Sequence, residues 1–333
     1  MSNYSTVGSI FGSSVETFPH NFNTALEKFY KHPFKIEKCQ EFEYKKYAHL
    51  FNTPTLLGVE IEVENLPGEI PCPEFWTSSK DGSLRNNGRE FKSYPLSPEQ
   101  AFLAVDVLLK LLSKNSRIPD FSWRTSIHFH LNVRDLKEEE LKNLALTSIV
   151  IEPVLFQIAG LDREQSNFCT PLARSIAIPL FRKYFNKEIN LKEFHKKWDQ
   201  GQGTHKYSSI NFSRLNDLGT VEYRHLGGTN DTKVLFQWMA LLLSIFEYSV
   251  KTASENLKNL LYSLESPEDF LHFVDSVFKG LDISVSKETI ESMKIAVSKI
   301  KEIFITLPNF KFSGNSSAAD YAQTIKEKHP KNK

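Results

Sequence analysis

Cysteine is scarce in this sequence. The chain has 333 residues and only three cysteines, Cys39, Cys72 and Cys169, which lie far apart and form no C-x-x-C pair. A disulfide scaffold and a structural zinc site both need cysteines or histidines at short, regular spacings. Both are therefore excluded as the basis of the fold, and an apolar core has to hold the chain together.

An excess of charge of one sign is also lacking. Lys plus Arg number 41 and Asp plus Glu number 40, so the formal net charge is +1. General binding to nucleic acids needs clustered positive charge. The composition therefore argues against a protein that binds nucleic acids in general.

Long apolar runs are missing as well. The first 20 residues have no basic start and no continuous apolar stretch, so we expect no signal peptide. The most apolar segment, 234–250, contains Gln237 and Glu247 and is shorter than the ~20 residues of a membrane span. We therefore expect a buried helix there, in a cytoplasmic protein without membrane contacts.

Apolar and aromatic residues are plentiful, at 40% and 12% of the chain. A chain of this length and composition can bury a large core, which excludes disorder as a whole. Residues 1–48 show no sustained period and are interpreted as an extension that lies on the core or is partly mobile. We expect one folded domain over residues 49–308 and a polar, Lys-rich tail over residues 309–333.

Alternation of apolar and polar residues predicts the strands. It occurs in four segments, residues 55–65, 74–96, 122–135 and 206–229, of which the second and the fourth each indicate two strands joined by a turn. A helix is expected from Pro98 with Ser97 as its N-cap, another over residues 136–160, and further helices from Asp231 onward. Strands first and helices last indicate an α+β fold, an antiparallel sheet covered on one side by helices.

Polar side chains share one face of these strands. They are Glu60 and Glu62 on the first, Glu90 on a later one, His128 and His130 on the next, and Glu222 and Arg224 on the last. Carboxylates about 4 Å apart repel by roughly 1 kcal/mol in water, and by about 4 kcal/mol at an effective dielectric constant near 20. Such a cluster needs protons or cations, and its oxygen and imidazole ligands favour Mg²⁺ or Mn²⁺.

Each motif has a plainer interpretation when it is taken alone. An E-x-E-x-E strand at a sheet edge is typical of a solvated face, an H-x-H pair of surface or core histidines, and an E-x-R pair of an exposed salt bridge. Their joint occurrence, in this order and each on one strand face, favours a shared site.

The order of these motifs resembles the amidoligase family of phages and bacteria. It is carried by GVEIEVE, DGSLRNNGREFKSYPL, SIHFHLNV and KYSSINFSRLNDLGTVEYRHLGGT, with Trp238 downstream. This family is itself similar to glutamine synthetase and γ-glutamylcysteine synthetase, and the resemblance covers about residues 55 to 245. It implies a glutamine synthetase-like antiparallel sheet with an active-site face, and a helical C-terminal part within the catalytic domain.

The resemblance also implies roles for single residues. The metal ligands it implies are Glu60, Glu62, Glu90, His128 and Glu222. His130 would contact an ATP phosphate, although the order of the two histidines stays open. Glu222 and Arg224 would be catalytic, Arg224 by holding the transferring phosphate, and Lys206, Tyr207 and Asn211 fit the nucleotide-side strand. Thr220 stands where glutamine synthetase has a further arginine, so the phosphate clamp differs here.

Asp81 and Arg163 are the substrate-side candidates. Asp81 precedes Gly82 and fits an ordinary turn aspartate equally well, whereas Arg163 also fits a cap of the helix that ends near Gly160. His225 alternates onto the apolar face, so we interpret it as structural.

The implied activity is ATP-dependent joining of a carboxylate to an amine through an acyl phosphate, with ATP and Mg²⁺ or Mn²⁺ as cofactors. The substrates would be a carboxylate and amine pair from a peptide, a protein or a cell-wall component, with ammonia coming from solution or from a separate glutaminase. A phage-encoded copy would act in the host cytoplasm. Two alternatives stay open, a guanidino-kinase-like phosphotransferase on the same fold and a non-catalytic binding or virion-associated relative.

Overall fold

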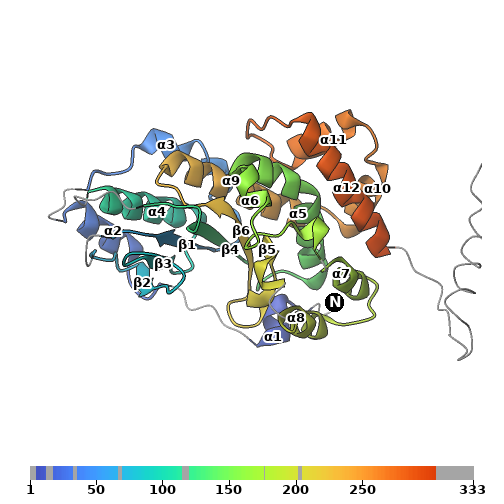
Figure 1. The fold of residues 1–333 in the computed structure, drawn as a ribbon, viewed down its shortest axis with the longest axis horizontal. Helices are drawn as coiled ribbons and strands as arrows, with labels where there is room; N and C mark the ends of the chain where they lie inside the picture. The colour runs from blue at the N-terminus through green and yellow to red at the C-terminus, as the bar shows by residue number, and fades with distance from the viewer. Residues whose placement is uncertain are drawn as a thin grey trace, which may run out of the picture.

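The computed structural model of the chain describes residues 5–12, 18–32, 36–66, 70–114, 120–175, 177–201 and 205–304. The predicted tail, residues 309–333, lies outside them. The described part is an α+β fold in which one antiparallel sheet carries helices on one face, as the strand and helix patterns predict (Figure 1).

The sheet has six antiparallel strands in the order β2-β3-β1-β4-β6-β5. Their bounds are β1 Leu57–Val63, β2 Trp76–Lys80, β3 Arg89–Ser93, β4 Ser126–Asn132, β5 Ile210–Asn211 and β6 Thr220–Gly227. All lie in the segments predicted from alternation, and β2 and β3 form the predicted pair. Because β1 is an interior strand, its glutamates do not lie at a solvated sheet edge.

Alternation in β1 places Val59, Ile61 and Val63 in the core, each no more than 1% exposed. β-Branched side chains suit such a pleated, buried surface. Three helices cover this apolar face: α4 Pro98–Ser113, α5 Glu138–Ala159 and α9 Thr232–Lys251 (Figure 1). The opposite face of the sheet is left to the polar side chains.

The helices α5 and α9 are long and apolar enough to cross a membrane by length and composition. In the described structure most residues of both helices are buried against other parts of the protein. The expected buried helix at residues 234–250 is therefore confirmed as the greater part of α9.

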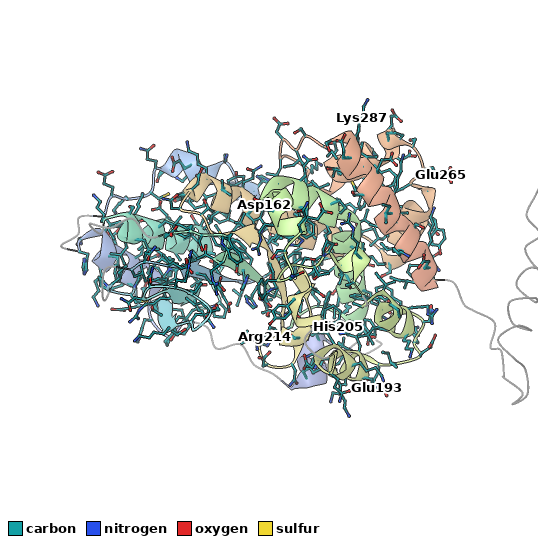
Figure 2. All side chains as sticks on the ribbon, viewed as in Figure 1. Asp162, Glu193, His205, Arg214, Glu265 and Lys287 are labelled. Atoms are coloured by element: carbon teal, nitrogen blue, oxygen red, sulfur yellow. The ribbon has the colours of Figure 1, made fainter. Side chains whose placement is uncertain are left out.

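The remaining elements surround this centre. On the side of β5 lie α6 Leu161–Glu164, η2 Leu172–Arg174, α7 Ile178–Phe185, α8 Leu191–Asp199, η3 His205–Tyr207 and η4 Ser213–Leu215, and α10 Ser254–Ser263, α11 Pro267–Val277 and α12 Lys287–Phe304 follow α9. Charged side chains such as Glu193, Glu265 and Lys287 point outward from this outer layer (Figure 2).

The N-terminal segment contributes helices to the same core. These are α1 Val7–Phe11, α2 Phe22–Tyr30, α3 Glu41–Lys45 and η1 Ala48–Leu50. Phe22 and Phe29 of α2 pack against Phe75, with ring centroids 4.9 and 6.3 Å apart. The described parts of residues 1–48 therefore lie on the core, which is one of the two states expected for them.

Candidate functional site

Six side chains meet on the polar face of the sheet and form what we call the ligand cluster. They are Glu60, Glu62, Glu90, His128, His130 and Glu222. Register explains the meeting, because Glu60 pairs with His128 on β4 and Glu62 pairs with Glu90 on β3, while His130 pairs with Glu222 on β6. The sheet thus brings together every residue predicted as a metal ligand.

Glu60 lies at the centre of the cluster. Its Oε2 lies 3.4 Å from Nδ1 of His128, and its Oε1 lies 3.4 Å from Nε2 of His130. Burial raises the pKa of Glu60, but hydrogen bonds and charge from the two histidines outweigh burial and hold that pKa below its usual range. Glu60 is therefore an ionised carboxylate, ready to bind a cation.

A hydrogen-bond chain orients His128. Ser126 donates its hydroxyl and its backbone N–H to the same oxygen of Glu62, both over 2.8 Å. Because this hydroxyl already donates to Glu62, its oxygen, 2.7 Å from Nε2 of His128, accepts a hydrogen bond from that nitrogen. Nδ1 faces Glu60 and Glu222, with a carboxylate oxygen of each 3.4 Å away. A cation held by these carboxylates would replace the proton on Nδ1 and bind its lone pair.

His130 contacts a different partner on each side of its ring. Its Nδ1 lies 3.0 Å from the hydroxyl of Thr220, and its buried Nε2 faces Oε1 of Glu60 at 3.4 Å as an ion pair rather than a well-formed hydrogen bond. Burial lowers the pKa of His130, but Glu60 and Glu222 raise it above the usual value. A buried nitrogen that faces a carboxylate without a well-formed hydrogen bond suits contact with a cation or a phosphate oxygen.

Glu222 is held by two neighbours. Asn211 donates to its Oε2 over 2.8 Å, and Nη1 of Arg224 donates to Oε1. Burial raises the pKa of Glu222, but His128, Arg224 and His130 outweigh burial and lower it. Nε of Arg224 has no partner among the described residues, so this guanidinium has a donor left for an anion.

A shift of register between β4 and β6 changes the direction in which these side chains point. The pairs Ile127↔Leu226 and Phe129↔Tyr223 leave Arg224 and His225 together opposite His128. Such a bulge bends the strand and turns its side chains. His225 points into the apolar layer, fully buried beside Phe156 and Trp238, as its expected structural role requires.

Glu90 shows the cost of gathering carboxylates. Burial and the charge of Glu60 raise the pKa of Glu90 to about 7, although Lys92 acts in the opposite direction. Nζ of Lys92 lies 2.7 Å from Glu90 and 4.0 Å from Glu60. A proton on Glu90 and the ammonium of Lys92 therefore offset the repulsion that we expect for this face.

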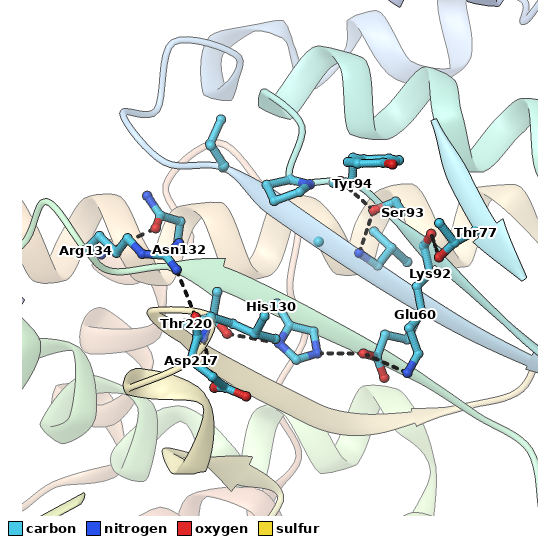
Figure 3. A pocket seen from close by; sticks show the side chains of 15 residues that line it. Glu60, Thr77, Lys92, Ser93, Tyr94, His130, Asn132, Arg134, Asp217 and Thr220 are labelled. Carbon is cyan, nitrogen blue, oxygen red and sulfur yellow. Dashed lines mark hydrogen bonds and ion pairs between the residues drawn. The ribbon is translucent and has the colours of Figure 1, made fainter. Parts of the chain in front are cut away.

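Two adjoining cavities open over the cluster. One, of about 670 Å³, contains the whole cluster together with Asp81, Arg214 and Arg224, and we call it the cluster cavity. The other, of about 510 Å³, lies beyond His130 and is lined by Tyr94, Arg134 and other residues, and we call it the outer cavity (Figure 3). Glu60, Lys92 and His130 line both cavities, which therefore meet at these three side chains.

The other predicted residues have different surroundings. Asp81 lines the cluster cavity and offers a carboxylate oxygen within 4.8 Å of ligand atoms of Glu62 and Glu90. Asn211 also lines it, but its amide is taken up by Glu222, the Trp198 indole and the backbone of Ser213.

Arg163 is not among the residues that line either cavity. Its guanidinium donates to the backbone carbonyls of Arg224 and His225 over 2.7 and 2.9 Å, and so braces β6 from behind. The ring of Tyr207 meets Phe168. Lys206 belongs to η3, and its side chain lies outside the described atoms.

Three residues of the site or its immediate surroundings were not predicted from the sequence. Lys92 follows Glu90 by two residues on one strand, so alternation could have revealed it. Ser126 precedes His128 by two residues and carries the same signal. Arg214 lies on a turn without periodicity, and no local pattern in the sequence marks it.

The donor set fits divalent cations. Three groups each bring their ligand atoms within 4.8 Å of one another: Glu60 with Glu90 and His128, Glu60 with His130 and Glu222, and Glu62 with Asp81 and Glu90. Carboxylate oxygens with one imidazole are ligands that Mg²⁺ or Mn²⁺ accepts. Each histidine belongs to one of the first two groups. Asp81 belongs to the third group, which contains carboxylates alone.

Comparisons with known proteins give one family match. No curated protein matches the chain. Among solved structures, it is similar to a bifunctional glutathione synthetase from Pasteurella multocida at 8% identity and a TM-score of 0.42, over 80% of this chain and 49% of that one. The chain thus spans about half the length of that relative. A family model described as "Putative amidoligase enzyme" matches residues 77–246, just over half of the chain. The protein therefore belongs to the amidoligase family of enzymes.

Proposed function

We propose that the protein is an ATP-dependent carboxylate–amine ligase that works through an acyl phosphate. Membership of the amidoligase family supports a ligase. The observation that carries the proposal is the ligand cluster, in which three overlapping groups of ligand atoms lie beside Arg224 on one rigid sheet face. A platform of this kind suits phosphoryl transfer, where catalysis is mostly positioning and charge stabilisation.

The three groups of the cluster would hold Mg²⁺ or Mn²⁺. Cations bound there would neutralise the phosphate oxygens of ATP as negative charge moves between them. The protein's own contribution is to keep Glu60 ionised and to present the Nδ1 lone pair of His128. It also holds Glu222 between Asn211 and Arg224.

The two cavities suggest where the reactants bind. We assign the nucleoside of ATP to the outer cavity, where Tyr94 and Leu56 supply apolar surface and Asn132 supplies polar groups. Its phosphates would pass His130, whose Nε2, without a well-formed hydrogen bond, would contact one of them. The carboxylate and the amine would then enter the cluster cavity from the end of Asp81 and Arg224.

The reaction follows from these positions. An oxygen of the substrate carboxylate attacks the γ-phosphorus, the bond to the β-phosphate oxygen breaks, and ADP leaves. Arg224 would hold the transferring group, because a guanidinium offers paired donors to phosphate oxygens. The amine then attacks the acyl carbon, phosphate leaves, and the nitrogen gives up a proton as the amide forms.

Thermal unfolding with and without ATP and Mg²⁺ or Mn²⁺ tests the proposal. A nucleotide at about 100 times its Kd adds roughly 2.7 kcal/mol of stability, which raises the midpoint of a protein of this size by about 4 °C. The variant Glu60→Gln/Glu62→Gln should lose the metal-dependent part of this shift. No shift with either metal would contradict the proposal.

Product analysis separates ligation from the phosphotransferase alternative. ADP release that depends on an acceptor and ends in a stable phosphorylated product would favour a kinase, whereas an amide with free phosphate supports a ligase. We propose a peptide, a protein or a cell-wall component as the source of the carboxylate and the amine, and the cytoplasm as the site of action. Ammonia, if it is the amine, would come from solution or from a separate glutaminase.

A further inference from the structure

The basic side chains around the cluster cavity differ in their ion-pair partners. Among the described residues that line it, Lys92, Arg214 and Arg224 carry positive charge. Lys92 pairs with Glu90 and Arg224 with Glu222, and both of these carboxylates belong to the ligand cluster. Arg214 instead pairs with Asp217, which is not a member of the cluster.

The pair of Arg214 and Asp217 can open easily. The two residues are three apart between β5 and β6, and Figure 2 labels Arg214 there. Nη1 of Arg214 and Oδ2 of Asp217 lie 3.0 Å apart, and each side chain is 50% exposed. Exposed ion pairs of this kind contribute little to stability, because water solvates both partners when they separate. Arg214 can therefore leave Asp217 for another anion without disturbing the fold.

The backbone under Arg214 is nevertheless fixed to the site. The N–H of Ser213 donates to Oδ1 of Asn211 over 3.0 Å, and the same amide donates to Glu222 through its nitrogen. The carbonyl of Ser213 is bound by His195 over 2.8 Å. A movable guanidinium thus extends from an anchored turn at the wall of the cluster cavity.

The negative charges of the ligand cluster act on the guanidinium of Arg214. Burial lowers the pKa of Arg214, but the carboxylates of Asp217, Glu222 and Glu60 outweigh burial and raise it. In turn, the charge of Arg214 opposes protonation of His130. Arg214 is therefore close enough to influence the groups that would surround the phosphates of a bound nucleotide.

We propose that Arg214 leaves Asp217 when ATP binds and contacts the terminal phosphate together with Arg224, which lines the same cavity. The inference rests on the proposed function. The γ-phosphate is the anion that ATP has and ADP lacks, and two guanidiniums share its charge better than one. Asp217 holds the side chain near the cavity in the absence of nucleotide.

The affinities for two nucleotides test the inference. We would titrate wild-type protein and Arg214→Gln with ADP and with an ATP analogue whose β–γ link cannot be hydrolysed, both with Mg²⁺. The variant should bind the analogue about 10- to 100-fold more weakly, as expected for a lost charge-assisted contact, and should bind ADP within about twofold of wild type. Arg174→Gln is the matched control, because Arg174 is also exposed and pairs with Glu164.

A second variant tests the role of Asp217 in holding Arg214 when no nucleotide is bound. Asp217→Asn frees the guanidinium, so binding of the analogue should stay equal to wild type or become a few-fold tighter. Arg214→Gln binding both nucleotides like wild type, or losing both equally, would overturn the inference and leave the ligase proposal intact. Wild-type protein binding neither nucleotide would overturn the ligase proposal, and this inference with it.

Discussion

Glu60 shows how one side chain can belong to several candidate cation sites. It belongs to two of the three groups in the ligand cluster, and both histidines lie 3.4 Å from its oxygens. Glu222 pairs with His130 across β4 and β6 and belongs with Glu60 and His130 to one of these groups. Loss of either carboxylate therefore removes a ligand while the apolar side of the sheet stays unchanged.

Glu60→Gln and Glu222→Gln should each abolish turnover and weaken Mn²⁺ binding by at least about tenfold, since an amide carries no charge to offset the cation. Both variants should keep the wild-type far-ultraviolet circular dichroism. Glu291→Gln, an exposed glutamate paired with Lys294, is the control and should bind Mn²⁺ normally. Normal activity in both site variants would end the idea of a metal platform.

Among the elements, the loop between β2 and β3 carries Asp81 to the cluster cavity. Two contacts fix it from below: Glu64, fully buried, accepts from the side chain and the backbone N–H of Arg85, and Arg124 donates to the carbonyl of Ser83. Asn86 and Asn87 hold positive φ angles of 49° and 60°, which asparagine tolerates better than most residues. The predicted break in the strand is thus an anchored turn.

The ion pair of Glu64 predicts a pH dependence. Burial raises the pKa of Glu64, but the hydrogen bonds from Arg85 outweigh burial and lower it to about 2 from the usual 4.5. A depressed carboxyl pKa stabilises the fold above about pH 4.5, and this stabilisation disappears as the pH falls toward 2.

Glu64→Gln should therefore lower the thermal midpoint by a few degrees at pH 7 and by less at pH 3. Thermal unfolding at both values measures the difference. Glu302→Gln, which loses only an exposed pair with Lys299, should match wild type at both. The same loss at pH 3 as at pH 7 would show that charge is not the cause.

For the whole molecule, the N-terminal segment and the sheet share one core. Val7 is fully buried, and Phe22 and Phe29 cover Phe75, which precedes β2 directly. Each buried phenylalanine contributes about 1.5–3 kcal/mol, against a typical total stability of about 5–15 kcal/mol. Removal of this segment therefore has to be costly.

A variant lacking residues 1–48 should lose most of its folded, soluble protein or unfold more than about 10 °C earlier than wild type. Differential scanning calorimetry of the purified variant measures this. A variant lacking residues 309–333, which the sequence predicts to be a polar tail, is the control for chain length. An unchanged midpoint after removal of residues 1–48 would mean that the segment is a separable extension.

Local patterns were sufficient for the strands and for the side chains that meet in the ligand cluster. Alternation put Glu60, His128 and Glu222 on polar strand faces, and their side chains do meet. Alternation also places Lys92 on the same strand face as Glu90. It was not predicted as part of the site, because a lysine on a polar face looks like an ordinary solvated residue. Arg163, predicted as a substrate-side residue or a helix cap, instead donates to backbone carbonyls of β6, and no local pattern marks partners on another element.

The sequence by itself determined which residues face the core and which face the site, because the side-chain period of a strand depends only on neighbouring residues. Tertiary structure alone decided which strands became neighbours, in the order β2-β3-β1-β4-β6-β5. That order sets the distances within the ligand cluster and places Arg214 at the wall of its cavity. Such contacts join residues far apart in the chain, and only packing of the whole core selects them.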